Sequence, residues 1–416
     1  MAQWTDQHGE GVAVLERSRD HTTALKNTAV TEDVWTSTDQ IDIDLWDRVR
    51  QPSDLFMDVR LLRAVEISMR DSCRFRYVLY RNTHSEPVAI AVLCTFTIDI
   101  GVLANDAWSR WALGCFRKMS PKLVQYRITF CGLPVSACQS SLRFAPGTDG
   151  GPVLQQLDQT LRTIARQDRA SVIVLKEFAD EELPALASLE SLGYRKADSL
   201  PTHHVAMNCS SLDGYLLGIG NKRRANIRRS IKKCDAGGVD FMVASDYETI
   251  ERLFTEEVYR YYESVLGRSE TQLEHLPRSF FLELAKNLPD ACEVIFAMRD
   301  NRVLAFCITI WSGSTYHALF LGYDSASNPE VDLYFNLFYH TIDAAAKRGG
   351  KTVEFGQNSE YFKRTKLGAL QSRRSIYVRG GNTVMNWIIN ALFKQLFPPR
   401  PLANETKDTL PEAAAA

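Results

Sequence analysis

The sequence predicts an α/β protein with two tandem domains, each built on a mixed central β-sheet flanked by helices. A chain of 416 residues is too long for one ordinary hydrophobic core, so two domains are the expected number. One order of elements also occurs twice: a β-hairpin, then a helix, then a short β-rich run. Such self-similarity is typical of an internal structural repeat, although two unrelated hairpins would give the same pattern by chance.

Both copies consist of apolar runs separated by polar turns, which is the pattern that predicts strands and hairpins. In the first copy the hairpin runs, the helix and the β-rich run are residues 77–80, 87–96, 153–169 and 171–175. In the second copy the corresponding segments are residues 293–298, 303–311, 331–348 and 352–355.

Composition sets the expected domain boundaries. Residues 1–40 are polar and lack periodicity, which predicts a flexible arm. We expect the first domain at residues 41–207 and the second, which carries the chemistry, at residues 208–382. A last helix in the segment 383–416 has apolar residues along one side, which we expect to dock on the core before a disordered tail: Trp387, Ile388, Ala391, Leu392 and Leu396.

The charge of the chain is nearly balanced. There are 49 Lys and Arg and 50 Asp and Glu, so the net charge is −1 and no whole-molecule field attracts nucleic acid or an anionic membrane. The N-terminus lacks the basic and apolar regions of a secretory signal, and the longest apolar run, residues 87–98, is too short to span a bilayer. We therefore expect a cytoplasmic protein without a membrane span.

The nine cysteines are scattered along the chain, and no pair has CxxC spacing. This pattern favours buried free thiols in a reducing compartment over disulfides or a metal site. A nucleophilic cysteine is the alternative interpretation.

A strongly basic segment separates the two predicted domains. Seven of the twelve residues 222–233 are Lys or Arg, and Ile227 and Ile231 lie one helical turn apart. This spacing predicts a helix with an apolar stripe and a basic face, ending at Gly237 and Gly238. A basic face of this kind can contact the phosphates of RNA or of one phosphorylated ligand, or it can simply face solvent.

The second half carries motifs of one acyltransferase family. The basic segment GNKRRANIRRSIKK is followed by a hairpin ending in RDNRVLAFCITI, a helix containing LYFNL, and the run GQNS with Lys363 and Gly368 after it. These motifs resemble the BioF2-like and FemAB-like branch of the GNAT acyltransferases. The resemblance covers residues 210–380, and the first half looks like the degenerate GNAT-like domain that such two-domain proteins carry.

The resemblance implies two tandem GNAT-like domains and transfer of an acyl group to an amine. The donor is acyl-coenzyme A in most GNAT enzymes and aminoacyl-tRNA in FemAB-type relatives; we expect acyl-coenzyme A and a small-molecule amine acceptor here, without a metal. The usual phosphate loop of the family, Arg/Gln-x-x-Gly-x-Gly/Ala, is replaced by residues 323–328 (YDSASN). This departure leaves aminoacyl-tRNA open as the donor and a non-catalytic ligand-binding module open as the function.

Three residues of the second half are candidates for proton transfer. Amine acylation needs a free amine, a donor for the oxyanion and an acid for the leaving group. His317 and Glu354 lie in predicted strands and are alternative general bases, and Tyr323 is the candidate acid. The structural alternatives are a half-buried histidine bonded to a carbonyl, a strand carboxylate that does not face the cleft, and a core aromatic residue. We expect the ligand cleft near residues 323–336 and 357–363.

Candidate ligands of the donor lie where a helix is predicted to start after a strand. Asn328 followed by proline is a typical helix start, and helix N-termini bind phosphate. Ser327, Asn328 and Asn336 are therefore assigned to the donor. Glu330 and Asp332 in the same turn would repel phosphate, so plain helix capping is the alternative.

Four further residues are predicted to bind substrate: Gln357, Lys363, Arg224 and Arg228. Lys363 lies in a polar segment, where we expect the side chain to stay solvated and protonated. Its predicted role is to neutralise an anionic substrate without transferring a proton.

Overall fold

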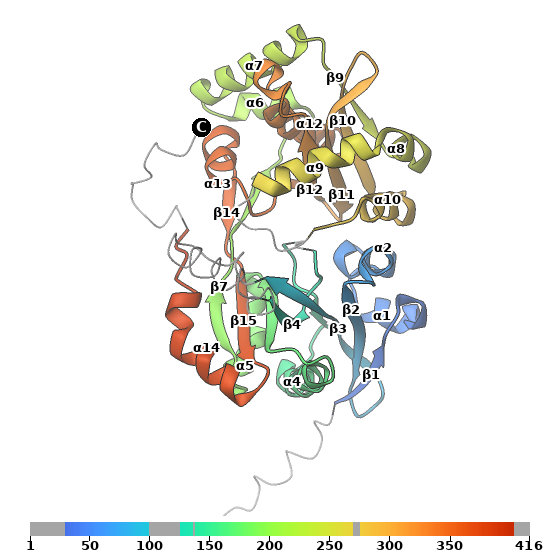
Figure 1. The fold of residues 1–416 in the computed structure, drawn as a ribbon, viewed down its shortest axis with the longest axis vertical. Helices are drawn as coiled ribbons and strands as arrows, with labels where there is room; N and C mark the ends of the chain where they lie inside the picture. Colours follow the sequence, from blue (N-terminus) through green and yellow to red (C-terminus); the bar gives the residue numbers. More distant parts are fainter. Residues whose placement is uncertain (1–29, 100–124, 136–137, 269–274, 403–416) are drawn as a thin grey trace, which may run out of the picture.

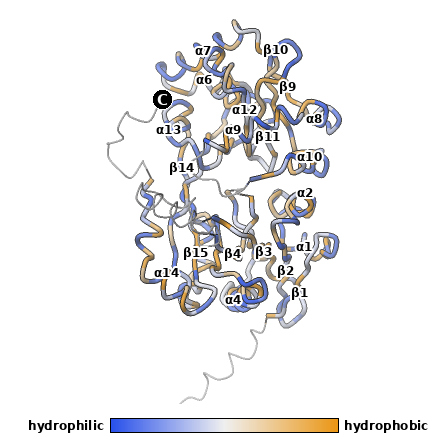
Figure 2. Tube along the Cα trace, viewed as in Figure 1, coloured by the Kyte–Doolittle hydropathy of each residue, from blue (hydrophilic) through white to orange (hydrophobic). Residues whose placement is uncertain are grey.

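The computed structural model describes residues 30–99, 125–135, 138–268 and 275–402. These residues form two α/β units, one above the other along the long axis of the molecule (Figure 1). Each unit is built on its own mixed sheet, so the predicted fold class is confirmed. Figure 2 shows many of the apolar residues along the strands of the two sheets, where they form the cores.

The first unit contains an eight-stranded sheet with the order β1-β2-β3-β4-β6-β15-β7, and β5 pairs with β3. Its strands are β1 (Thr31–Trp35), β2 (Cys73–Arg81), β3 (Pro87–Asp99), β4 (Gln125–Cys131), β5 (Leu142–Phe144), β6 (Val172–Phe178), β7 (Arg195–Asp198) and β15 (Ser375–Gly380). Its helices are η2 (Thr38–Gln40), α1 (Ile43–Val49), η3 (Leu55–Met57), α2 (Val59–Met69), α4 (Gly150–Gln167), η6 (Asp180–Leu186), α5 (Ser188–Ser191) and α14 (Thr383–Leu396).

The second unit contains a seven-stranded sheet with the order β14-β8-β13-β12-β11-β10-β9. Its strands are β8 (Thr202–Ala206), β9 (Asp240–Ala244), β10 (Cys292–Arg299), β11 (Arg302–Ser312), β12 (Thr315–Tyr323), β13 (Thr352–Glu354) and β14 (Leu370–Ser372). Its helices are α6 (Leu212–Gly218), α7 (Asn221–Ala236), α8 (Tyr247–Leu253), α9 (Glu256–Arg268), α10 (Arg278–Asn287), α11 (Asn328–Val331), α12 (Leu333–Lys347), α13 (Glu360–Phe362) and the π-helical turn η7 (Lys363–Leu367).

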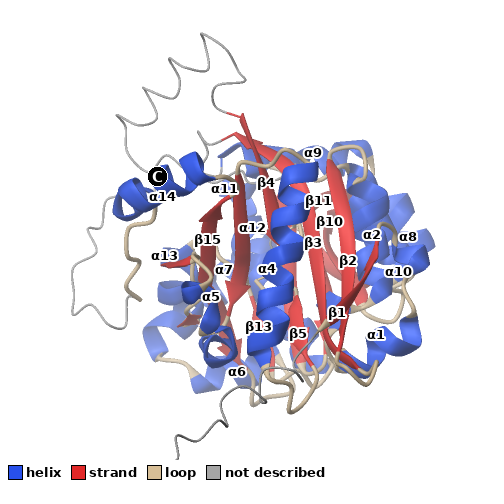
Figure 3. Ribbon diagram, turned by 90° about the horizontal axis from the view of Figure 1, so that it is seen from below, coloured by secondary structure: helices blue, strands red, loops and turns tan. Residues whose placement is uncertain are grey.

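The two sheets repeat one topology, which confirms the predicted internal repeat. In each sheet three antiparallel strands precede a parallel pair, and the two strands of the pair are joined through a helix: β4 with β6 through α4, and β12 with β13 through α12. Two antiparallel strands complete each sheet after the parallel pair. Viewed along the long axis, the strands of the two sheets run in similar directions, with helices around them (Figure 3).

The units exchange one strand each, so the predicted domain boundaries are wrong at both junctions. β8 was assigned to the first domain, but it pairs with β13 and β14 of the second sheet. β15 was assigned to the second domain, but it lies between β6 and β7 of the first sheet. A local apolar pattern predicts a strand but not its partner, because the backbone bonds of a sheet join segments that are distant in sequence.

The expected N-terminal arm is too long. Residues 31–35 form β1, whose backbone pairs with β2 from Thr31–Arg81 to Trp35–Tyr77. Backbone pairing at the edge of a sheet does not need apolar periodicity, so the polar composition concealed this strand. Residues 1–29 and the predicted tail from residue 403 lie outside the described part of the chain.

Helix α14 forms as predicted, but the apolar stripe that was expected to dock faces solvent. Trp387 is 71% exposed, and Leu392 and Leu396 are also exposed. The helix packs on β15 through another side, where Ile389 is buried and Phe393 lies 4.7 Å from the Arg195 guanidinium. Apolar residues occur all round this helix, so periodicity could not identify the docking side.

The two units share one hydrophobic core. Trp46 and Phe56 of the first unit belong to the same buried cluster as Phe281 of the second, and α2 packs against α10. At the same junction the Ser312 hydroxyl donates a hydrogen bond to the Ser53 carbonyl at 2.6 Å. This shared core fixes the first unit against the face of the second sheet on which α9 and α10 lie.

Candidate functional site

The central strands of the second sheet diverge. β12 and β13 are paired only through Thr315–Thr352, Tyr316–Val353 and His317–Glu354. Beyond these pairs β12 continues to Tyr323, whereas β13 ends at Glu354. A wedge therefore opens between the strands.

A β-bulge lies on the β12 side of this wedge. Ile308 is opposite Phe320 and Thr309 is opposite Ala318, so Leu319 is an extra residue in β12. Leu319 and Phe320 both pack toward the α9 side of the sheet, whereas Ala318 packs toward the α12 side. The extra residue of a bulge is left unpaired in the ladder, so its backbone can bind a ligand.

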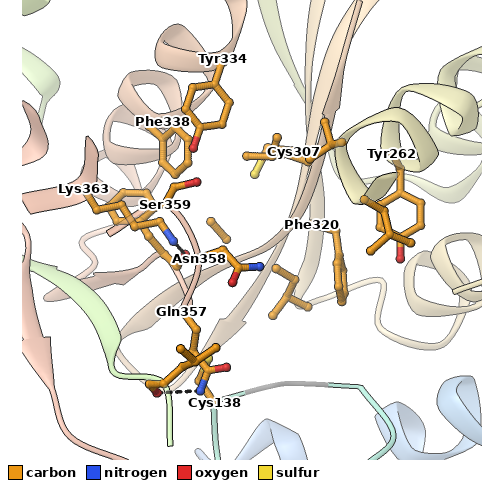
Figure 4. Close-up of a pocket in the computed structure, with 17 residues that line it drawn as sticks. Cys138, Tyr262, Cys307, Phe320, Tyr334, Phe338, Gln357, Asn358, Ser359 and Lys363 are labelled. Atoms are coloured by element: carbon orange, nitrogen blue, oxygen red, sulfur yellow. Dashed lines mark hydrogen bonds between the residues drawn. The ribbon is translucent and has the colours of Figure 1, made fainter. Parts of the chain in front are cut away.

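A cavity of about 220 Å³ occupies the wedge. Its walls come from β12, α9, α12 and the segment after β13, and Leu200 and Cys138 close the end nearest the first unit. Figure 4 shows Lys363, Ser359 and Tyr334 on one side of the cavity and Phe320 and Tyr262 on the other. The cavity lies where the cleft was expected, and residues before β8 contribute to it.

Lys363 lines the cavity from the first position of η7. Its side chain is 3% exposed, and its Nζ donates hydrogen bonds to the carbonyls of Phe355 at 2.5 Å and Gly356 at 3.4 Å. Burial lowers the pKa of Lys363 to about 8, against the opposing effects of Cys138 and Glu354. The expectation of a solvated lysine is therefore wrong. The polar segment is a helical turn whose inner side is buried rather than an open loop.

The basic helix holds this turn in place. The Arg223 side chain donates to the carbonyls of Thr365 at 3.0 Å and Arg364 at 3.4 Å. Gly368, with φ +73°, ends the turn, and a Cβ at this position would lie 2.5 Å from Arg223 Nη1. The glycine of the motif therefore satisfies both a left-handed backbone and a close approach of the arginine.

Gln357, which was predicted to bind substrate, also lines the cavity. Its Nε2 donates to the Leu200 carbonyl at 2.9 Å, which connects the cavity edge to the segment before β8. Asn358 and Ser359 follow on the same edge and are exposed.

Tyr334 is a cavity residue that sequence reasoning missed. It lies in the first turn of α12 and lines the cavity together with Ser359. Burial raises the pKa of Tyr334 to about 12, so the hydroxyl keeps its proton at neutral pH. Its place next to the predicted helix start was the available signal, but an aromatic residue there is also typical of a core position.

Tyr323 and His317 do not line the described cavity. Tyr323 is half-buried at the end of β12, beneath the Arg268 guanidinium at 5.2 Å and beside the Tyr334 ring at 5.6 Å. His317 is buried, with its ring 4.9 Å from that of Phe56 in the first unit. Burial lowers the pKa of His317 to about 3, which leaves the imidazole a weak base. The structure therefore does not support His317 as the general base.

Glu354 lies next to His317 in the ladder and behind the cavity wall. It is 9% exposed, and neither its Oε1 nor the Thr202 hydroxyl has a hydrogen-bond partner in the described residues. Burial raises its pKa, against the opposing charges of Arg374 and Lys363. It therefore influences Lys363 electrostatically without facing the cavity itself.

The residues assigned to the donor form the start of α12 instead of an open phosphate site. Asn328 Oδ1 accepts the N–H of Tyr334 at 2.9 Å, and the Ser327 hydroxyl donates to Asp324 at 2.8 Å. Asn336 is fully buried, and its amide donates to Ser230 of α7 and to the Asp332 carbonyl. Asn336 does not line the cavity, so the structure does not support its assignment to the donor.

Carboxylates surround this helix start, and two of them, Asp332 and Glu330, have basic partners. Asp332 Oδ1 lies 2.7 Å from Lys233 Nζ, and Glu330 Oε1 lies 3.3 Å from Arg299. Asp332 has φ 53°, which separates the single turn α11 from α12. The acidic groups make this helix start a poor site for a pyrophosphate.

Arg224 and Arg228 lie away from the cavity, so their direct contact with a substrate in it is not supported. The Arg224 side chain donates to the carbonyls of Leu217 and Ile219, both at 3.1 Å, at the end of α6. Arg228 is exposed, 3.9 Å from Asp213. The outer face of α7 presents exposed cations to solvent: Lys222, Arg228, Arg229 and Lys232.

Metal ligands were not expected, and in the described part of the chain no three His, Cys, Asp or Glu residues are grouped to hold a metal ion. The described cysteines are free thiols, as expected, and Cys115 lies outside the described residues. None of the described helices combines the length and apolar character needed to cross a membrane.

The cavity thus lies in a wedge between two parallel strands, with a β-bulge on one side and a helix start beyond it. Residues 221–364 match the family described as acetyltransferase (GNAT) domain, so the second unit is a GNAT domain. The fold of the whole chain is similar to that of FemX, with a TM-score of 0.52 and 12% identity over 88% of this chain and 99% of FemX. This likeness confirms the predicted FemAB-like tandem architecture as a fold.

Two other solved structures are similar. A tandem GNAT protein from the clavulanic acid biosynthesis pathway has a TM-score of 0.48 and 10% identity, over 85% of this chain and 99% of that protein. The C-terminal domain of a putative lysylphosphatidylglycerol synthetase from Agrobacterium fabrum has a TM-score of 0.48 and 12% identity, over 83% and 96%. A sequence search of the curated proteins finds no match.

Proposed function

We propose that the protein is an N-acyltransferase that joins an acyl group to an amine in the cavity of the second unit. The observation that carries this proposal is the buried Lys363 ammonium, which lines the same cavity as a β-bulge in a wedge between two parallel strands. A cation and an unpaired backbone N–H in a desolvated site can stabilise the oxyanion that forms during acyl transfer.

In the proposed reaction the amine nitrogen attacks the carbonyl carbon of the donor. A new C–N bond forms while the C–O double bond becomes an oxyanion, which accepts hydrogen bonds from the Lys363 ammonium and from the Leu319 backbone. Two carbonyls orient Lys363, which leaves one of its three N–H groups for the oxyanion. Collapse breaks the bond to the leaving group.

Tyr334 is the proposed acid. Its hydroxyl gives a proton to the leaving group, and the proton lost by the attacking amine restores the hydroxyl through solvent. The raised pKa of Tyr334 keeps this donor protonated. This role replaces the one predicted for Tyr323, which lies behind Tyr334.

Acyl-coenzyme A is the proposed donor and a small-molecule amine the proposed acceptor, in keeping with the acetyltransferase family match. The leaving group is then a thiolate, which takes the proton from Tyr334. Binding and alignment of the two substrates would supply much of the acceleration, since no strong base faces the cavity in the described residues.

Aminoacyl-tRNA is the second candidate donor, and two observations favour it. The acidic start of α12 is a poor pyrophosphate site, and the outer face of α7 carries four exposed cations that can contact a nucleic-acid backbone: Lys222, Arg228, Arg229 and Lys232.

Thermal shift and product formation with coenzyme A, acetyl-coenzyme A and charged tRNA would test the proposal. A donor that binds the native state raises the melting temperature by mass action. With the accepted donor, Lys363→Met should lower kcat by about 10²–10³-fold, as expected for loss of an oxyanion donor. Lys366→Met, an exposed lysine of the same turn, is the matched control. Binding of a donor without any product would instead indicate a non-catalytic module.

A further inference from the structure

The cavity has two chemically different sides. Toward α12 and the segment after β13 it presents the Tyr334 hydroxyl, Gln357, Ser359 and the Lys363 ammonium, next to the apolar rings of Phe338 and Phe355. Toward α9 it is lined by Tyr262, Val265, Leu266, Leu319 and Phe320. Because the strands diverge, one bound molecule can contact both sides.

The α9 side is apolar and uncharged in the described residues that form it. The Tyr262 hydroxyl accepts the backbone N–H of Leu276 at 3.4 Å and so points away from the cavity. The β-bulge places Leu319 and Phe320 side by side on this wall, where a regular strand would turn one of them to the other face.

The wall is also firmly packed. The Phe320 ring makes edge-on contacts with Phe281 at 5.7 Å, Phe280 at 5.9 Å and Tyr262 at 6.1 Å between ring centroids. Phe280 and Phe281 are fully buried in the core that joins the two units. The wall is therefore already ordered before an apolar group binds, so binding does not have to fix the side chains of the wall.

We propose that the substrate carries an uncharged apolar body, an aliphatic chain of several carbons or a phenyl group, that is held against this α9 wall. The inference rests on the proposed function for the position of the reacting carbonyl beside Lys363. The apolar body can belong to the acyl group or to the amine. In either case the product carries a hydrocarbon next to its new amide bond.

Simple amides test the inference without a donor, because they resemble the product. One series varies the acyl side: acetamide, butanamide, hexanamide and benzamide. The other varies the amine side: N-methyl-, N-butyl- and N-hexylacetamide. We expect affinity, measured by NMR titration, to rise about 4-fold for each methylene buried in one of the two series. The rising series identifies which substrate carries the apolar body. Flat or falling affinity in both series, or no binding in either, would overturn the inference.

Two variants of one wall residue link this binding to the α9 side. Val265→Trp should weaken the six-carbon amide of the rising series at least 10-fold and leave acetamide unchanged. Val265→Ala should move the preferred chain to a longer one, and it keeps the test decisive if the tryptophan variant fails to fold. Val243→Trp, at an exposed position of β9, is the matched control and should change neither. If Val243→Trp and Val265→Trp change the affinity for the six-carbon amide equally, the assignment of the apolar body to the α9 side is contradicted.

The two proposals can fail separately. If the amides bind as expected but neither acyl-coenzyme A nor charged tRNA is turned over, the apolar site stands and the acyltransferase proposal fails. If a donor is turned over but longer acyl chains and longer amines are no better than acetyl and methyl groups, the function stands and the apolar specificity fails.

Discussion

Replacing Lys363 by Met should remove a pH-dependent part of the protein's stability. In the unfolded chain this lysine has a pKa of 10.5, whereas burial lowers it to about 8 in the native state. Between these values the unfolded state binds more protons than the native state, so stability rises with pH. The difference between the two pKa values corresponds to about 3 kcal/mol, gained between pH 8 and pH 10.5.

Urea unfolding of the wild type and of Lys363→Met between pH 7 and pH 10.5 would measure this contribution as a difference. The unfolding free energy of the wild type minus that of Lys363→Met should rise by about 3 kcal/mol from the low to the high end of this pH range. Lys366→Met, from the exposed side of the same turn, should track the wild type at every pH. Parallel curves for wild type and Lys363→Met would refute the buried position of this charge.

Three further perturbations test the site. The rate of acyl transfer should fall as pH rises through about 8, because only the Lys363 ammonium donates to the oxyanion. Lys363→Arg should move this fall to higher pH, and the same pH profile for Lys363→Arg and the wild type would count against the proposed role. Gly368→Ala should destabilise the protein by about 1–2 kcal/mol for its left-handed backbone, plus the displacement of Arg223, as measured by urea unfolding; a neutral effect would contradict the close approach. Asn336→Ala should cost about 1–3 kcal/mol of stability with KM for the donor unchanged, whereas a raised KM without loss of stability would restore its assignment to the donor.

The sequence was sufficient for the fold class, the internal repeat and the side of the cavity after β13, but not for the exchanged strands or for the α9 side of the cavity. Repeated hairpins and helices are local patterns. The run from Gly356 to Gly368 is a short motif that can be recognised from its own residues, without knowledge of the segments that pack against it. The burial of Lys363 was not predictable in the same way, because it depends on Arg223 reaching across from α7 to close the turn.

Catalytic candidates were harder to choose than cavity walls. His317 and Glu354 are polar residues in apolar strands, a pattern that indicates either a cleft or a buried structural role. Their neighbours decide between the two: Phe56 lies against His317, and Glu354 pairs with His204 of β8. Both contacts come from segments far away in the sequence, so no local pattern contains them.

The strand exchange determines when each half of this protein can finish folding during synthesis. β15 lies between β6 and β7 in the first sheet, yet it is formed by residues 375–380. The first sheet therefore keeps an open position after β7 while about 180 further residues leave the ribosome, and a chain that stops short of residue 375 lacks a strand that both neighbours need. A nascent or truncated chain would present the unpaired backbone of β6, with its buried Ile173 and Leu175, as an edge available to other strands.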